Sequence, residues 1–300
     1  MMFNLNNVKF SSSPFEWFVL DNAINKEAFT EIQDEVKTIF DNISKIDSAS
    51  FEDAALYDTS FPAGRANVIG GGSTFDRHAA KMVLNETKNG GALEKLCNEF
   101  LDVNLQKSLY RLLIPVSFFD LSSLRPVKIH PEEHKMTILD YIFYKNCYVN
   151  LKLSSYTSNF GLMQHKDHGK KVTALLFYLG FTDSIKRNDC GIQLYDVTDG
   201  NKKWSLKESP QTLEHYDDVK LKLAREVQSY PNRLFGFRKT RHSWHGVKPS
   251  QFPLDVRREA LQINLMKHYN ASRNLSKILV VVNGIKNLIR PFVKRILGFK

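Results

Sequence analysis

Hydrophobic positions in the first part of the chain follow the period of a helix. In the segment 25–43, apolar side chains recur every three or four residues, and Asn25 stands where an N-cap residue belongs. This pattern predicts an amphipathic helix, preceded by a short strand at 16–22. The same spacing predicts helices over 78–87 and 92–113, the second ended by Pro115.

From about residue 147 the hydrophobic positions alternate instead. The stretch "YVNLKLSSY", 148–156, places apolar and polar residues in turn, which is typical of a half-buried strand. The run "VTALLFYL", 172–179, is apolar, β-branched and aromatic, and Gly180 ends it, so it predicts a buried strand. Further strands are predicted at 191–197, 233–237 and 258–266. Helices followed by a series of strands predict a mainly β fold, a sandwich or barrel braced by N-terminal helices.

The same patterns suggest how the chain is divided. We expect one domain over 1–268, with helical support in 1–146 and a β core in 147–268. Residues 196–229, with a helix predicted at 212–227, interrupt the strands as an insertion. This insertion and the segment 117–146 are where we expect lids that shape a substrate pocket. The triple glycine at 70–72 lacks a following lysine-serine pair and is interpreted as a loop.

Charge sets the C-terminal tail, 269–300, apart from the domain. The chain has a net charge of +10, and much of the excess lies after Ala271, where there is no Asp or Glu. This uneven distribution disfavours a general nucleic-acid-binding role. The tail also has an apolar helical face, typical of a helix that lies on an anionic membrane. Docking of the same helix on the domain or on a second protomer remains the alternative.

Composition is that of an ordinary globular protein, with 42% hydrophobic and 25% charged residues. Cys97, Cys147 and Cys190 are too few and too scattered for a disulfide framework or a cysteine metal site. The start of the sequence has no signal-peptide pattern, and no apolar run approaches the ~20 residues that cross a bilayer. The simplest expected location is the reducing cytoplasm, with peripheral membrane contact through the tail as an option.

Candidate chemistry is concentrated in "HKDH", residues 165–168, directly ahead of the buried strand at 172–179. In an extended chain His165 and Asp167 point the same way, while Lys166 is expected to face out. Histidine plus carboxylate is two-thirds of the facial triad that holds non-haem Fe(II) and leaves other positions open. His245, in "RHSWHGVKPS", is the candidate for the second histidine.

Two other histidines compete for these roles. His168 could join His165 in a zinc site, but a spacing of three suits a helix and the flanking sequence predicts strand. His242 lies close to His245 in sequence, but we favour His245 because it stands in the "HGV" context.

A co-substrate site is predicted on the strand 258–266. The positions from Arg258 to Asn264 that share one face are small or polar, and the intervening positions are apolar. An arginine on that face can enter the cavity, where its planar fork suits a carboxylate. Arg257 is the rival, but neighbours in a strand face opposite ways, so only one of the two can do so.

The sequence resembles the Fe(II)- and 2-oxoglutarate-dependent dioxygenases, specifically their prolyl-4-hydroxylase-like branch. The resemblance is carried, in the family's order, by "HKD", "VTALLFYL", "CGIQLYD", "YPNRLFGF", "WHGVKP" and "REAL". The strand-then-helix opening also resembles the start of such domains. The chain departs from the family's pattern at Cys190, where the family often has glycine, and in the insertion 196–229.

The resemblance implies a double-stranded β-helix, or jelly roll, and a set of roles. Iron would be held by His165, Asp167 and His245, and Arg258 would bind the C5 carboxylate of 2-oxoglutarate. Tyr156 matches a tyrosine that in some members hydrogen-bonds this co-substrate. Because an aspartate stands where halogenating relatives have a small residue, hydroxylation is favoured over halogenation.

The implied activity is hydroxylation of an unactivated C–H bond in a peptidyl or small-molecule substrate, with release of succinate and CO2. It would need Fe(II), 2-oxoglutarate and O2, and ascorbate is a further candidate. Two other classes stay open: a non-catalytic jelly-roll module that retains a metal, and a zinc-dependent hydrolase that uses the same three ligands.

Overall fold

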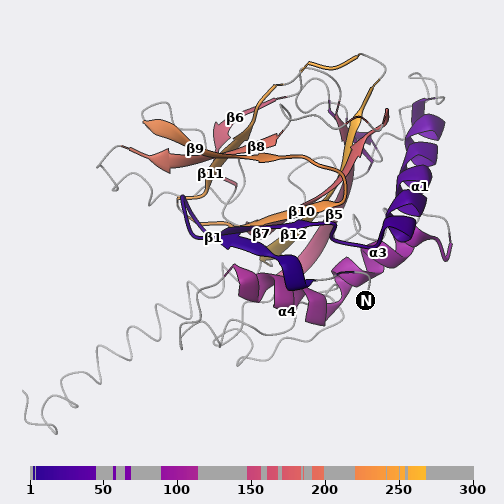
Figure 1. The fold of residues 1–300 in the computed structure, drawn as a ribbon, viewed down its shortest axis with the longest axis horizontal. Coiled ribbons are helices and arrows are strands. Elements are labelled where there is room, and N and C mark those ends of the chain that lie inside the picture. Colours follow the sequence, from indigo (N-terminus) through magenta and orange to yellow (C-terminus); the bar gives the residue numbers. More distant parts are fainter. Residues whose placement is uncertain are drawn as a thin grey trace, which may run out of the picture.

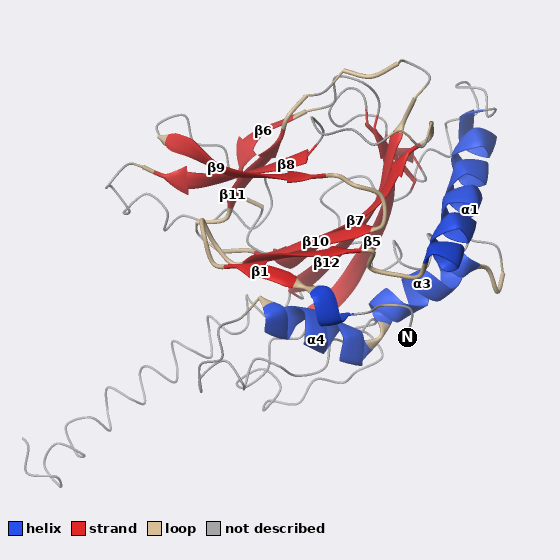
Figure 2. Cartoon of the chain, viewed as in Figure 1, coloured by secondary structure: helices blue, strands red, loops and turns tan. Residues whose placement is uncertain are grey.

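Two antiparallel sheets stacked face to face form the centre of the molecule, with helices outside the larger sheet (Figure 1, Figure 2). The computed structural model describes residues 3, 5–44, 57–58, 65–68, 89–113, 147–156, 161–167, 171–183, 185, 191–198, 220–240, 242–249, 251–253 and 256–267.

The two sheets contain strands from distant parts of the sequence. The larger sheet has, in spatial order, β1 (Lys9–Ser11), β2 (Trp17–Asp21), β10 (Arg233–Arg238), β7 (Lys171–Phe181), β12 (Arg258–Lys267), β5 (Cys147–Tyr156), β4 (Arg65–Val68) and β3 (Tyr57–Asp58). The smaller sheet has β6 (Leu162–His165), β11 (Trp244–Val247), β8 (Gly191–Val197) and β9 (Leu221–Gln228). A short 3-10 helix, η1 (Leu5–Asn7), precedes β1.

The order of pairing from β5 to β12 is that of a jelly roll. The first of these eight strands pairs with the last, β5 with β12, and the second with the seventh, β6 with β11. The third pairs with the sixth, β7 with β10, and the two central strands, β8 and β9, pair with each other. This nested order, spread over two sheets, defines two interlocked Greek keys. The predicted β core with N-terminal helices is therefore confirmed.

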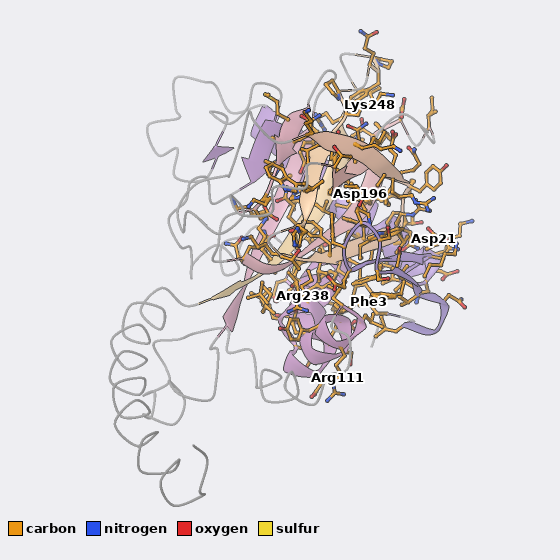
Figure 3. The ribbon with its side chains drawn as sticks, turned by 90° about the vertical axis from the view of Figure 1, so that its left-hand side faces the viewer. Phe3, Asp21, Arg111, Asp196, Arg238 and Lys248 are labelled. Carbon is orange, nitrogen blue, oxygen red and sulfur yellow. The ribbon has the colours of Figure 1, made fainter. Side chains whose placement is uncertain are left out.

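The core has two layers, one on each face of the larger sheet. Alternation along β7 shows the division: Phe177 packs with the helices, whereas Tyr178 packs between the two sheets. Phe3, labelled in Figure 3, joins the helical layer, where its ring centroid lies 4.8 Å from that of Phe100. The layer between the sheets combines residues of both, and these line the interior of the jelly roll: Tyr156, Ala174, Tyr178, Ile192, Leu194, Val227, Phe235, Phe237 and Ala260.

Two of the predicted helices lie wholly within the described residues. Helix α1 (Lys26–Ser44) begins after Asn25, whose side-chain oxygen accepts a hydrogen bond from the Ala28 amide at 2.8 Å, so the predicted N-cap is confirmed. The single helix predicted over 92–113 is wrong, because the structure has α3 (Ala92–Leu101) and α4 (Val103–Leu112). Asp102 separates them: its backbone is extended, and its carboxylate caps α4 by accepting from the amides of residues 104 and 105.

The helix predicted over 212–227 is wrong from residue 221 onward, where the chain forms β9. β9 pairs along its length with β8, and Val227 packs into the layer between the sheets opposite Ile192. The strand mixes three charged with four apolar residues, a pattern that a helix can also have, but pairing with β8 decides its structure. The last part of the expected insertion is therefore a core strand.

Several predictions fall on residues outside those described. They are the helix at 78–87, the glycine loop at 70–72, the lid at 117–146 and the basic tail at 269–300. Within the described part of the chain, no helix combines the length and the apolar character needed to cross a membrane.

The turn before β10 depends on Asn232, which has a positive φ of 58°. Its side chain accepts from the Ile24 amide at 3.1 Å and donates to the Ile24 carbonyl at 2.8 Å, joining this turn to the start of α1. We expect Asn232→Ala to lower the free energy of unfolding by about 2–4 kcal/mol, since it loses two buried hydrogen bonds and the tolerance of asparagine for this backbone. Urea denaturation measures the change.

The matched control for this prediction is Asn22→Ala. Asn22 also has a positive φ, 50°, but it is exposed. Asn22→Ala should therefore lower the free energy of unfolding by about 1 kcal/mol, the cost of placing alanine at a positive φ. Equal losses in the two variants would show that the bonds to Ile24 contribute nothing.

Candidate metal centre and anion site

Three buried side chains converge at one end of the smaller sheet. His165 is the last residue of β6, Asp167 lies two residues later, and His245 is on β11. His165 and His245 are opposite each other in the β6–β11 ladder. One potential ligand atom from each of the three residues lies within 4.8 Å of the others. The site is therefore built on paired backbone, which holds the ligand atoms close together.

The backbone determines which nitrogen of each histidine is available. Nδ1 of His165 lies 2.7 Å from the Met163 carbonyl oxygen, and Nδ1 of His245 lies 3.0 Å from that of Ser243. A carbonyl only accepts, so both Nδ1 atoms carry the proton and donate it. Nε2 is then the unprotonated nitrogen of each ring. This is the arrangement in which a histidine binds a metal through Nε2 and is oriented through Nδ1.

Both imidazoles are neutral at pH 7. Burial, and to a lesser extent the neighbouring His245, lowers the pKa of His165 to about 3. Burial also lowers the pKa of His245. Phe237 packs against His245, with ring centroids 4.6 Å apart, and thereby keeps this side of the site dry. Neutral imidazole is the form that binds a metal ion, so no proton has to leave either ring.

The two oxygens of Asp167 have different surroundings. Oδ1 accepts from Lys171 Nζ at 2.7 Å, whereas Oδ2 has no hydrogen-bond partner among the described residues and lies 3.8 Å from His245 Nε2. Burial on its own would raise the pKa of Asp167, but Lys171 and the two histidines hold it well below its usual range. A buried anionic oxygen without a donor, beside two imidazole lone pairs, fits a divalent cation.

Lys166 was predicted to face outward, but it does not reach solvent. Its side chain is fully buried, and its Nζ lies 5.4 Å from the centroid of the Trp244 ring. Trp244 precedes His245 on β11, so Lys166 packs against the strand that carries the second histidine.

The competing histidines are not part of this cluster. His242 lies in the turn before β11, half-buried, and is absent from the one group of potential metal ligands found among the described residues. His168 lies outside those residues.

Arg258 lies inside the jelly roll at the start of β12. Its side chain is 5% exposed, and its guanidinium carbon lies 4.7 Å from the centroid of the Tyr156 ring. Within the described structure it makes no ion pair, and its Nε has no hydrogen-bond acceptor. A buried guanidinium without an anion is costly, so the position fits a ligand that carries a carboxylate.

Arg257 has a different environment. Its side chain is 25% exposed, and its Nε lies 3.8 Å from Glu259 Oε1. The two arginines thus face opposite ways, as alternation in a strand requires.

Two tyrosines adjoin Arg258. The Tyr156 hydroxyl accepts a hydrogen bond from Gln262 Nε2 at 2.5 Å, and the side chain is buried. Tyr178, which the sequence analysis did not single out, is buried in the same layer. Burial raises its pKa, while the charge of Arg258 acts in the opposite direction. Tyr178 lies in an apolar run, so the alternation of β7 cannot be seen in the sequence. Its phenol hydroxyl, among apolar neighbours, is the one signal that could have identified it as a site residue.

Comparison of the sequence with protein-family models and with curated proteins gave no match. Comparison with solved structures found 162 similar chains, and three of these illustrate the likeness. A prolyl hydroxylase from Trichoplax adhaerens, in complex with a peptide fragment of the hypoxia inducible factor oxygen degradation domain, is 14% identical, covers 84% of this chain and 83% of its own, and has a TM-score of 0.41.

The other two similar structures are also oxygenases. A prolyl-4-hydroxylase from Pseudomonas putida is 10% identical, covers 84% of this chain and 92% of its own, and has a TM-score of 0.42. A rice dioxygenase for auxin oxidation is 10% identical, covers 85% of this chain and 74% of its own, and has a TM-score of 0.42. At this level of identity the likeness is one of fold.

Proposed function

We propose that the protein is an Fe(II)- and 2-oxoglutarate-dependent dioxygenase that hydroxylates a C–H bond of a peptidyl or small-molecule substrate. One observation carries the proposal: two neutral histidines and a carboxylate with a bare oxygen share a jelly roll with a buried arginine that has no ion pair among the described residues. A site that binds a metal but no co-substrate would account for the two histidines and the carboxylate. It would leave the buried arginine, Arg258, without a role.

In this proposal Nε2 of His165, Nε2 of His245 and Oδ2 of Asp167 hold Fe(II). Two nitrogens and one oxygen on a single face are the donor set of non-haem iron oxygenases, and they leave positions open for other ligands. Bound iron supplies the chemistry in which substrate, 2-oxoglutarate and O2 become hydroxylated substrate, succinate and CO2. The protein contributes the orientation of its two imidazoles, through the Met163 and Ser243 carbonyls.

Arg258 binds the distal carboxylate of 2-oxoglutarate through its two-pronged guanidinium. Tyr156 stacks on that guanidinium, and its hydroxyl, held by Gln262, faces the same interior. The apolar residues between the sheets, such as Leu194 and Phe237, exclude water around the co-substrate. These residues bind and position the co-substrate, and none of them needs to transfer a proton.

Formation of succinate tests the proposal. Metal-stripped protein is incubated with 2-oxoglutarate in air, with Fe(II) in one sample and Zn²⁺ in another, and succinate is quantified. We expect succinate above the protein-free background with Fe(II) only, and His242→Ala, a variant of the histidine outside the cluster, should behave like the parent. A protein that binds Fe(II) but forms no succinate, or one in which Zn²⁺ restores a hydrolytic activity, would contradict the proposal.

A further inference from the structure

Lys171, the first residue of β7, makes a short ionic contact with the candidate metal centre. Its Nζ donates to Oδ1 of Asp167 at 2.7 Å. The two side chains are 16% and 5% exposed, so the pair is shielded from bulk water and from screening by salt. Lys171 was not singled out in the sequence, where it follows another lysine.

The direction of the Lys171 side chain depends on an irregularity in β7. Thr173 is opposite Leu265 on β12, but Met266, the next residue of β12, is opposite Lys171. One extra residue, Val172, is thus inserted in β7, and it packs toward the helices. Such a bulge reverses the alternation beyond it, so Lys171 turns to the side on which Asp167 lies. The backbone of β7 therefore aims this ammonium group at the carboxylate.

The contact makes the two carboxylate oxygens inequivalent. Oδ1 is occupied by Lys171, while Oδ2 is left without a hydrogen bond among the described residues and lies 3.8 Å from His245 Nε2. Without Lys171 the carboxylate could rotate about its terminal bond, and either oxygen or both could face the metal, because this torsion is broad and two-fold.

We propose that Lys171, aimed by the bulge at Val172, is a positioning residue that limits Asp167 to one metal-binding oxygen. This inference rests on the metal site of the proposed function. A carboxylate that binds through both oxygens occupies two coordination positions, whereas one held by Lys171 occupies one. The lysine thereby keeps a position free for the co-substrate or dioxygen without touching either.

The test uses Co²⁺, whose visible absorption reports coordination number and which needs neither 2-oxoglutarate nor turnover. Metal-free parent protein, Lys171→Met and Lys171→Arg are titrated with Co²⁺, following the dissociation constant and the intensity of the visible bands. Lys171→Met removes the ammonium and keeps the stem, while Lys171→Arg keeps a cation that can bind Oδ1. The matched control is Lys9→Met, which removes the lysine of an ion pair with Asp21 on β2, 3.0 Å long.

We expect Lys171→Met to raise the dissociation constant for Co²⁺ by about 10- to 100-fold, the usual effect of losing a partner of a metal ligand. Its visible bands should weaken, because a carboxylate bound through both oxygens raises the coordination number. Lys171→Arg should have nearly the parental dissociation constant and band intensity. Lys9→Met should leave both the dissociation constant and the band intensity unchanged.

Two results would overturn the inference. If Lys171→Met binds Co²⁺ with the spectrum of the parent, whatever the change in affinity, the lysine does not determine how Asp167 binds the metal. If the parent protein binds no Co²⁺, there is no metal site for it to organise. A parent that shows the expected Co²⁺ results but binds no 2-oxoglutarate would contradict the proposed function and leave the role of Lys171 intact.

Discussion

His245→Ala should abolish Fe(II) binding and lower 2-oxoglutarate turnover on the order of 10³-fold or more, equivalent to about 4 kcal/mol. His245 supplies one of only two nitrogen ligands, and its Nε2 is already deprotonated and aimed at Asp167 Oδ2. No other histidine among the described residues belongs to the cluster and could replace it. Metal content after gel filtration and succinate formation measure the two effects.

His242→Ala is the matched control for this variant, because it removes a histidine three positions away that lies outside the cluster. It should keep parental iron content and turnover. Circular dichroism should show that His245→Ala remains folded, since the ring lies beside Phe237 at the edge of the core. Full iron content in folded His245→Ala would show that the metal is held elsewhere.

Arg258→Met should raise the concentration of 2-oxoglutarate needed for half-saturation by roughly 30- to 1000-fold, since losing one partner of a buried ionic contact costs about 2–4 kcal/mol. Fe(II) affinity should be unchanged, because Arg258 is not among the ligand cluster. Lysine at this position keeps the charge but not the two-pronged guanidinium. The half-saturating 2-oxoglutarate concentration of Arg258→Lys should therefore lie between those of the parent and Arg258→Met. Arg257→Met, which removes the outward-facing neighbour, is the matched control.

The melting temperature distinguishes binding of 2-oxoglutarate by Arg258 from a purely structural role of this residue. In the protein without co-substrate the guanidinium is buried with no ion pair among the described residues. Its replacement by methionine should therefore leave the melting temperature equal or higher, while 2-oxoglutarate should no longer raise it. A strongly destabilised Arg258→Met that still binds 2-oxoglutarate like the parent would contradict the assignment.

The sequence was informative where local chemistry and strand periodicity agree. The two-residue spacing of His165 and Asp167, and the strand context of His245, were enough to predict that these side chains would meet. Alternation in the last core strand likewise predicted that only one of Arg258 and Arg257 enters the interior. The choice of Arg258 over Arg257, and of His245 over His242, came from the motifs that surround them.

What the sequence did not predict depends on contacts between distant segments. β9 has a pattern that a helix can also have and is a strand because it pairs with β8. Lys166 is buried where its side chain packs against Trp244 of β11. The bulge at Val172, which aims Lys171, is visible only in the register between β7 and β12. None of these partners is a neighbour in sequence, so no local pattern reports them.

The most direct test of the central claim is an anaerobic titration of 2-oxoglutarate into Fe(II)-loaded protein, monitored by visible absorption. Chelation of ferrous iron by this co-substrate produces a metal-to-ligand charge-transfer band. The account predicts a saturable band in the parent, no band in His245→Ala, and a band in Arg258→Met only at much higher 2-oxoglutarate. No band in folded protein shown to contain Fe(II) would contradict it, and the cluster would then be a metal site without an oxygenase co-substrate.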